Sequence, residues 1–422
     1  MTRARLLVTS ALALVMLPTF GTAAAGAACG PSFSVVPSPN VGTHNNELGA
    51  DDDDVLHGNA VAAISATNAW AVGHADVDTI NGRVPVTLIE HWNGTQWKVV
   101  PSPNASSSVA DELLAVAAVS ASNIWAVGDY VSSGTAHALI EHWNGQSWSV
   151  VSSPFVNGIG NKLDAISIIG PKDIWAVGVY TDFNSVNHTL TEHWNGTQWS
   201  GVISPNKSVT GLTTNNVLTG VGAVSSTDVL AVGTYYTNGV DSFRTLAERW
   251  NGQSWSIVPS ANRFTSLGKD NNVLLGVTAS ATGTPWAVGA STLDIQTGDQ
   301  AARSTQPLIE RWDGTRWSTV ASPSRLPDQG TLFGVARRSS SDVWAVGGET
   351  TGTGHDVTLV ERWNGTKWSV VPSPNLGTLD NDLFGVAIHP TTGTVFAVGS
   401  HLTGTSTNPG AYRTLVEQAC SV

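Results

Sequence analysis

The chain has 422 residues and a formal net charge of −12, and only 12% of its residues are charged, where roughly a quarter is usual for soluble domains. Lysine and arginine together number 20 and form no basic stripe, which excludes the usual electrostatic footprint of a nucleic-acid-binding protein. Glycine (43 residues) and tryptophan (17 residues) are abundant, and this composition is typical of a turn-rich, all-β protein.

The first 28 residues have the pattern of a secretory signal peptide. Arg3 and Arg5 form a short basic segment, the apolar run Leu6–Leu17 follows, and small residues complete the segment. The apolar run is short for a span of the bilayer. We therefore expect residues 1–28 to be removed and residues 29–422 to form a secreted, extracellular protein without a membrane-inserted segment.

A unit of 50 to 58 residues then repeats seven times. Its first landmark is the motif WAVG or a variant of it, starting at Trp70, Trp125, Trp175, Leu230, Trp286, Trp344 and Phe396. Its second landmark is a glutamate in a segment such as EHWNG, at Glu90, Glu141, Glu192, Glu248, Glu310, Glu361 and Glu417. The Asn-Gly turn predicts a β-hairpin, and the Pro-Ser-Pro that follows suits an edge strand that must stop.

Each unit therefore divides into four short antiparallel strands, and seven such units predict a seven-bladed β-propeller. The first strand provides a physical check. One position in it is always alanine or glycine, at Ala60, Ala115, Ala165, Gly220, Gly276, Gly334 and Gly385. Small side chains at this position would let the innermost strands of neighbouring blades approach one another around a central axis.

The sequence also predicts how the ring closes. The segment Phe33–Asn40 (FSVVPSPN) matches the fourth strand of the other units, whereas the last unit has no fourth strand. We expect the N-terminal segment to complete the last blade, which removes the exposed sheet edges. The same alignment places Cys29 and Cys420 on either side of the missing turn and predicts a disulfide between them. The alternative is a lipidated Cys29, which would leave Cys420 without a partner.

The units resemble kelch repeats. The similar segments are WAVGG at Trp344–Gly348 and TLVERWNGTKW at Thr358–Trp368, followed by VVPSP. The resemblance implies a propeller and does not specify an activity, because propellers support many functions. The expected architecture is also similar to that of secreted bacterial seven-bladed propellers such as the dispase autolysis-inducing protein, which implies interaction with an extracellular protein.

Function is expected on the face that carries the connections after the second and fourth strands. Three of these connections are long and variable: His74–Pro85, Asn206–Asn216 and Gly289–Pro307. Long loops on a rigid scaffold are the usual location of binding sites. We therefore predict a monomeric, non-catalytic binding module whose ligand is an extracellular protein or a glycan.

Five units carry an oxygen-bearing side chain near the start of the first strand, at Asp111, Asn161, Asn216, Asn272 and Asn381. Such a ring could bind a cation such as Ca²⁺ or the hydroxyl groups of a sugar. The alternative, which we favour, is that each residue starts its strand by bonding nearby backbone. The acidic run Asp51–Asp54 lacks the ligand spacing of an EF-hand, so we expect no resident metal or cofactor there.

The repeated glutamates are interpreted as structural. They occupy equivalent mid-strand positions, one per unit, and paired-carboxylate catalysis needs two groups within roughly 5–10 Å. We expect each glutamate to accept hydrogen bonds from a neighbouring blade. The histidines that follow three of them, His91, His142 and His193, are replaced by arginine in three later units, which preserves a hydrogen-bond donor and not a metal ligand.

The alternative function is a carbohydrate-active hydrolase or lyase with one asymmetric site. Such an enzyme would gather unlike residues, for example His74, Asp76, Arg83 and His401, at one mouth of the ring. Repeated pockets would instead favour a binding protein.

Overall fold

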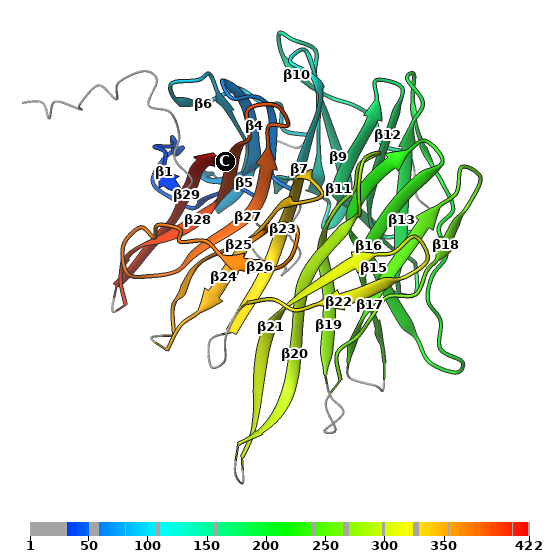
Figure 1. The fold of residues 1–422 in the computed structure, drawn as a ribbon. Coiled ribbons are helices and arrows are strands. Elements are labelled where there is room, and N and C mark those ends of the chain that lie inside the picture. The colour runs from blue at the N-terminus through cyan, green and yellow to red at the C-terminus, as the bar shows by residue number, and fades with distance from the viewer. Residues whose placement is uncertain are drawn as a thin grey trace, which may run out of the picture.

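The chain forms seven β-sheets that surround a central axis in the computed structural model (Figure 1). The structure describes residues 32–49, 59–80, 82–105, 110–154, 158–238, 242–264, 270–297, 300–323, 329–352, 354–406 and 408–420. The predicted all-β, seven-bladed propeller is therefore confirmed. The expected signal peptide and Cys29 lie outside the described residues, so the domain boundary and the extracellular location stay predictions.

The blades are numbered in chain order, with strands given from the inside outward. Blade 1 contains β2 (Asn46–Glu47) and β3 (Val61–Ser65), β4 (Asn68–Thr79), β5 (Gly82–Trp92) and β6 (Trp97–Val99). Blade 2 contains β7 (Asp111–Ser120), β8 (Asn123–Ser132), β9 (Thr135–Trp143) and β10 (Trp148–Val150). Blade 3 contains β11 (Gly160–Gly170), β12 (Asp173–Thr181), β13 (Asn187–Trp194) and β14 (Trp199–Gly201). Blade 4 contains β15 (Thr214–Ser225), β16 (Asp228–Thr237), β17 (Phe243–Trp250) and β18 (Trp255–Ile257).

Blade 5 contains β19 (Asn271–Thr278), β20 (Trp286–Thr297), β21 (Gln300–Trp312) and β22 (Trp317–Val320). Blade 6 contains β23 (Gln329–Ser339), β24 (Asp342–Thr350), β25 (Asp356–Trp363) and β26 (Trp368–Val370). Blade 7 contains β27 (Asn381–Ile388), β28 (Thr394–Thr405), β29 (Asn408–Cys420) and the N-terminal β1 (Ser34–Val35).

The alanine and glycine positions of the inner strands lie where neighbouring blades touch. A Cβ atom added to Gly276 would lie 2.7 Å from the carbonyl oxygen of Phe333 in the next blade. A Cβ atom added to Gly385 would lie 2.8 Å from the backbone nitrogen of Ala60, which joins the last blade to the first. These distances leave no room for a larger side chain, and they confirm the reason for the small residues.

The N-terminal strand closes the ring as predicted. In β1, Ser34 and Val35 pair with Gln418 and Glu417 of β29, so the first described strand completes the last blade. Cys420 is the last residue of β29 and lies opposite Thr394. Its predicted partner Cys29 lies outside the described residues, and the disulfide stays a prediction.

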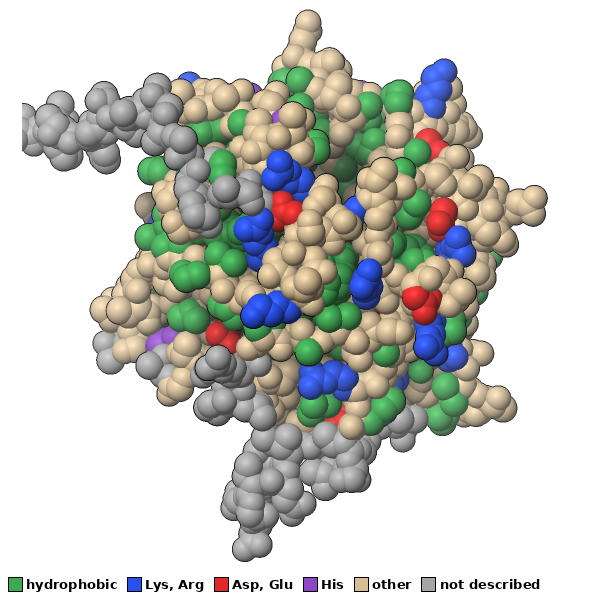
Figure 2. All heavy atoms as spheres, in the orientation of Figure 1, with side chains coloured by type: hydrophobic (Ala, Val, Ile, Leu, Met, Phe, Trp, Pro, Cys, Tyr) green, Lys and Arg blue, Asp and Glu red, His purple; other side chains and the backbone are tan. Residues whose placement is uncertain are grey.

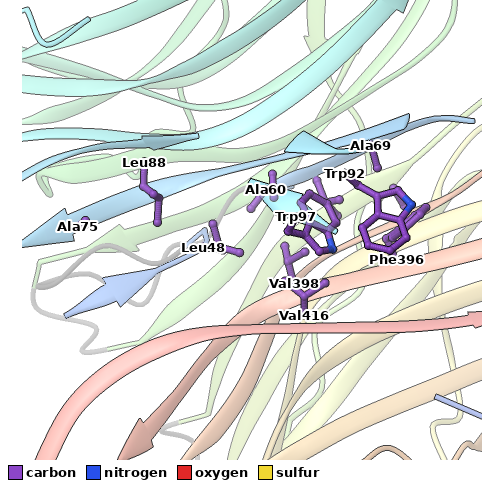
Figure 3. Close-up of a cluster of buried hydrophobic side chains, with 13 residues drawn as sticks. Leu48, Ala60, Ala69, Ala75, Leu88, Trp92, Trp97, Phe396, Val398 and Val416 are labelled. Atoms are coloured by element: carbon purple, nitrogen blue, oxygen red, sulfur yellow. The ribbon is translucent and has the colours of Figure 1, made fainter. Parts of the chain in front are cut away.

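Aromatic contacts between blades follow the same circular order. The fourth-strand tryptophan packs edge-on against the second-strand tryptophan of the preceding blade, as in Trp148 on Trp70, with ring centroids 5.6 Å apart. Between blades 7 and 1 the pair is Trp97 on Phe396, at 6.0 Å (Figure 3). Each such pair adds about 0.5–1.5 kcal/mol beyond the burial of its apolar area.

The repeated glutamates are fully buried, and each accepts a hydrogen bond from the Pro-Ser-Pro serine, or its counterpart, of the preceding blade. The pairs with their oxygen–oxygen distances are Ser102–Glu141 (2.9 Å), Ser153–Glu192 (2.8 Å), Ser204–Glu248 (2.6 Å), Ser260–Glu310 (2.9 Å), Ser322–Glu361 (2.6 Å) and Ser373–Glu417 (2.5 Å), together with Ser38–Glu90. The prediction that these glutamates join blades is confirmed.

Two of the three expected long loops are in fact strands. His74–Pro85 lies almost entirely in β4 and β5, and Gly289–Pro307 lies in β20 and β21. The prediction was wrong because backbone pairing continues outward along these segments, to Thr79 opposite Gly82 and Thr297 opposite Gln300. The result is a set of long hairpin arms, of which β20–β21 projects well beyond the ring (Figure 1).

The described residues form no concentrated patch of positive charge on the face seen in Figure 2. Lysine and arginine side chains lie there as separate spots among neutral and acidic surface. Across the described residues, no helix is long and apolar enough to cross a membrane.

Candidate functional site

The hairpin face is the face of the ring that carries the β-hairpins joining the second and third strands of the blades. On it, a pocket of about 720 Å³ opens between blades 3 to 6. We call it the mouth pocket. It is built from the start of the first strand, the end of the second strand and the start of the third strand, because these parts of each blade reach the hairpin face together.

The lining of the mouth pocket is apolar with uncharged polar groups between. It consists of Val179, Val217, Val273, Leu275 and Ala290, the amides Asn187, Asn215 and Asn271, the hydroxyl residues Thr234, Thr292, Thr305 and Thr331, and the aromatic residues Tyr236 and Phe243. None of the described residues that line it carries a carboxylate, imidazole, amine or guanidinium group. Such a surface can bind a ligand through apolar contact and hydrogen bonds.

The amides of the mouth pocket also link neighbouring blades. The side-chain oxygen of Asn215 accepts a hydrogen bond from the backbone N–H of Asn187 (2.9 Å), and that of Asn271 accepts one from the backbone N–H of Phe243 (2.9 Å). The rings of Tyr236 and Phe243 lie 5.1 Å apart. The wall of the pocket is therefore held by inter-blade hydrogen bonds as well as by the sheets.

Four of the five predicted oxygen-bearing residues hold backbone instead of lining this pocket. The Oδ1 atoms of Asp111, Asn216, Asn272 and Asn381 accept hydrogen bonds of 2.7–2.8 Å from backbone N–H groups of the preceding connection. All four side chains are buried. Their use as ligands for Ca²⁺ or sugar stays a prediction, but each already has the strand-starting contact that we favoured.

The fifth residue, Asn161, differs from the others. Its Oδ1 accepts a longer hydrogen bond (3.3 Å) from the backbone N–H of Ala138, and it lines a separate pocket between blades 2 and 3. Sequence reasoning missed Asn46, which has the same role in blade 1 and accepts a 2.6 Å hydrogen bond from the N–H of Val41. It was missed because the inner strand of blade 1 is split into β2 and β3, which displaces Asn46 from the repeat spacing.

All three histidines and two of the three arginines after the glutamates stack on the tryptophan of the WAVG motif, whereas Arg249, whose unit has Leu230 there, lies over Trp312. The ring of His91 lies 4.3 Å from that of Trp70 and bonds Asn68 at 3.0 Å. The guanidinium of Arg362 lies 4.9 Å over Trp344 and donates to a carboxylate of the same blade. Both residue types therefore have the same structural role, as expected.

Titratable groups gather in blades 6, 7 and 1. Burial raises the pKa of the Asp382 carboxyl to about 8, and the neighbouring carboxylates Asp356, Asp380 and Glu47 act in the same direction. Burial and these four carboxyl groups raise the pKa of the Tyr412 phenol to about 12. Among the described residues, no group of three or more His, Cys, Asp or Glu side chains is placed to hold a metal ion.

The structure brings only some of the four sequence-predicted unlike residues to this region. His74 lies opposite Glu47 in the β2–β4 ladder and is buried, as is Asp76. His401 lies on β28, and burial lowers its pKa. Arg83 lies elsewhere, on the exposed β4–β5 arm.

Comparison with known proteins identifies no family for the chain. No protein-family model and no curated protein matches it. Similar solved structures include YCF48 bound to D1 peptide, at 14% sequence identity and a TM-score of 0.49, covering 92% of this chain and 97% of that one. A polysaccharide lyase of the PL25 ulvan lyase family bound to a GlcA–Rha3S saccharide has 12% identity and a TM-score of 0.49, covering 89% and 95%. The polysaccharide lyase Uly1 has 11% identity and a TM-score of 0.49, covering 86% and 90%.

Proposed function

We propose that the protein is a secreted, monomeric, non-catalytic binding module that takes an extracellular protein or a glycan on its hairpin face, with the mouth pocket at the centre of the contact. The observation that carries this proposal is the pocket of about 720 Å³ with its uncharged lining from four blades. Its volume lies within the range of small-molecule and side-chain sites, roughly 300–1,000 Å³, and its mixture of apolar walls and a few polar groups is typical of them. The kelch-like repeat that we propose from the sequence would agree with use as a scaffold.

The test is to fill the mouth pocket and measure binding. Ligands are first identified with the purified chain on a glycan array and by capture from culture medium, and their affinity is then measured by calorimetry. We expect Thr292→Trp, which places an indole among the lining residues, to weaken binding at least tenfold. Thr95→Trp is the control, because it lies in the exposed Asn-Gly turn between β5 and β6, where blade 2 carries Gln146. Unchanged affinity of the Thr292→Trp variant would overturn the proposal.

A carbohydrate-active hydrolase or lyase is the second candidate, and the carboxyl groups around Asp382 favour it. A carboxyl that keeps its proton near neutral pH can act as a general acid, and the raised pKa of Asp382 meets this requirement. Incubation with a panel of polysaccharides, followed by assays for reducing ends and for the ultraviolet absorbance of unsaturated products, tests it. Activity that Asp382→Asn abolishes would support the enzyme and contradict a purely binding role.

A further inference from the structure

In five blades an asparagine ties the segment after the fourth strand to the third strand. Its side-chain oxygen accepts a hydrogen bond from the backbone N–H of a threonine in the third strand. The pairs are Thr87–Asn104 (2.9 Å), Thr189–Asn206 (2.9 Å), Thr245–Asn262 (3.0 Å), Thr358–Asn375 (2.8 Å) and Thr414–Asn40 (3.1 Å). We call this contact the Thr–Asn clip. It joins the third strand to the connection that leads to the next blade.

Blades 2 and 5 lack the clip. The threonine position holds Ala138 in blade 2 and Pro307 in blade 5, and the asparagine position of the sequence holds Phe155 and Ser324. Proline has no N–H to donate. The structure has a pocket at both places, of about 330 Å³ in blade 2 and about 280 Å³ in blade 5. Both pockets therefore lie where the repeat departs from its own pattern.

The pocket in blade 2 brings together several uncharged polar groups. Its lining includes Tyr130, His137, Ser152 and Asn161, and the rings of Tyr130 and His137 stack with centroids 5.1 Å apart. Asn161 uses its oxygen on Ala138, which leaves its NH₂ group for a ligand. In the described part of the chain, the hydroxyl groups of Tyr130 and Ser152 make no hydrogen bond.

We propose that the blade 2 pocket binds one neutral sugar ring of a glycan. Among the described residues, no carboxylate, lysine or arginine lines the pocket, so a charged ligand would lose its hydration there without a compensating partner from them. A pyranose ring has C–H groups that can contact the aromatic side chains of the pocket. Its hydroxyl groups can form hydrogen bonds with the amide of Asn161 and with the hydroxyl groups of Tyr130 and Ser152. The volume is at the lower end of the range for small-molecule sites, which fits a single ring.

This site is independent of the mouth pocket. It lies between blades 2 and 3, whereas the mouth pocket belongs to blades 3 to 6, and the two share no lining residue. Loss of one binding activity with the other retained would therefore separate the two proposals.

The experiment uses an array of neutral and charged methyl glycosides and disaccharides with the full chain, followed by NMR titration of the sugars that bind. We expect a neutral glycoside to bind, and Tyr130→Ala and Asn161→Asp to weaken it at least tenfold. Ser152→Trp changes another lining residue, keeps Tyr130 and His137 in the chain, and should also block the pocket. It keeps the test decisive if Tyr130→Ala fails to fold, which thermal unfolding would report.

Blade 3 provides a matched control. Tyr180 and His188 stack in the same way, with centroids 5.0 Å apart, beside a closed clip between Thr189 and Asn206. Tyr180→Ala should leave sugar binding unchanged. The double substitution Ala138→Thr, Phe155→Asn restores the clip residues of the other blades and should abolish binding. Absence of any neutral sugar ligand, or equal losses in Tyr130→Ala and Tyr180→Ala, would overturn the proposal.

Discussion

Burial of the seven inter-blade glutamates predicts a protein that loses stability as the pH rises through neutrality. The pKa values of these carboxyl groups are raised by burial from 4.5 to about 7 or about 8, at Glu90, Glu141, Glu192, Glu248, Glu310, Glu361 and Glu417. Between about pH 4.5 and these raised values the folded state holds protons that the unfolded state has released. The free energy of unfolding therefore falls as pH rises through this window.

Glu192 shows the size of the effect. A pKa unit corresponds to about 1.4 kcal/mol, so a rise from 4.5 to about 7 bounds its contribution at roughly 3 kcal/mol. The substitution Glu192→Gln keeps the size of the side chain and an oxygen that can accept the Ser153 hydrogen bond, and it removes the titration. Between pH 5.5 and 8.5, we expect the free energy of unfolding of the wild type to fall by about 1–3 kcal/mol more than that of the variant.

Urea unfolding followed by tryptophan fluorescence at the two pH values measures this difference. The lowered pKa of His91 and His142 acts in the opposite direction below about pH 6.5, but it is common to variant and wild type and cancels in the comparison. Asp313→Asn is the control, because this exposed turn residue has a pKa lowered to about 2 and is asparagine in most other blades. Equal pH dependence in Glu192→Gln and wild type, or a wild type that is as stable at pH 8.5 as at pH 5.5, would refute the reasoning.

Two further predictions concern ring closure. Gly385→Ala should destabilise the protein by about 1–3 kcal/mol, because its Cβ would lie 2.8 Å from the backbone nitrogen of Ala60. Thermal unfolding measures the change. Gly352→Ala is the control and should be neutral, because its Cβ would meet nothing within 4 Å. Mass spectrometry without reductant should find Cys29 and Cys420 joined and no free thiol in the secreted chain. Two free thiols, or an acylated Cys29, would contradict the predicted disulfide.

Most of the scaffold could be predicted from the repeated positions, because each repeated residue makes a contact that recurs from blade to blade. The alanine and glycine positions reflect contact between neighbouring inner strands, and the FSVVPSPN segment reveals the missing fourth strand. The glutamates were expected to bond a neighbouring blade, but the donor could not be named. The Pro-Ser-Pro serine is a partner only because the segment after the fourth strand turns over the next blade, and this crossing is a property of the assembled ring.

The candidate sites were less predictable, because they depend on how extended segments pair and on which blades lack the Thr–Asn clip. The arms His74–Pro85 and Gly289–Pro307 vary in length and composition as loops do, yet their backbones continue the ladder. The ring of Asp and Asn residues could be found by spacing, but its side chains turn toward the backbone of the preceding connection. Asn161 of blade 3 differs, because it lines the pocket beside blade 2, where the clip is absent.

The best candidates for functional residues in this protein are therefore the positions at which one blade departs from the repeat. A residue present in every blade, such as the buried glutamate, is explained by the contact between blades and needs no ligand to account for it. A residue whose structural partner is absent in one blade is released from that role. Where the Thr–Asn clip is lost in blade 2, the N–H of Ala138 donates to Asn161 of blade 3, which lines a pocket there, and the mouth pocket likewise occupies one side of the ring alone. Departures from the repeat, rather than the repeated tryptophans and glutamates, are the positions at which substitution should change binding without changing the fold.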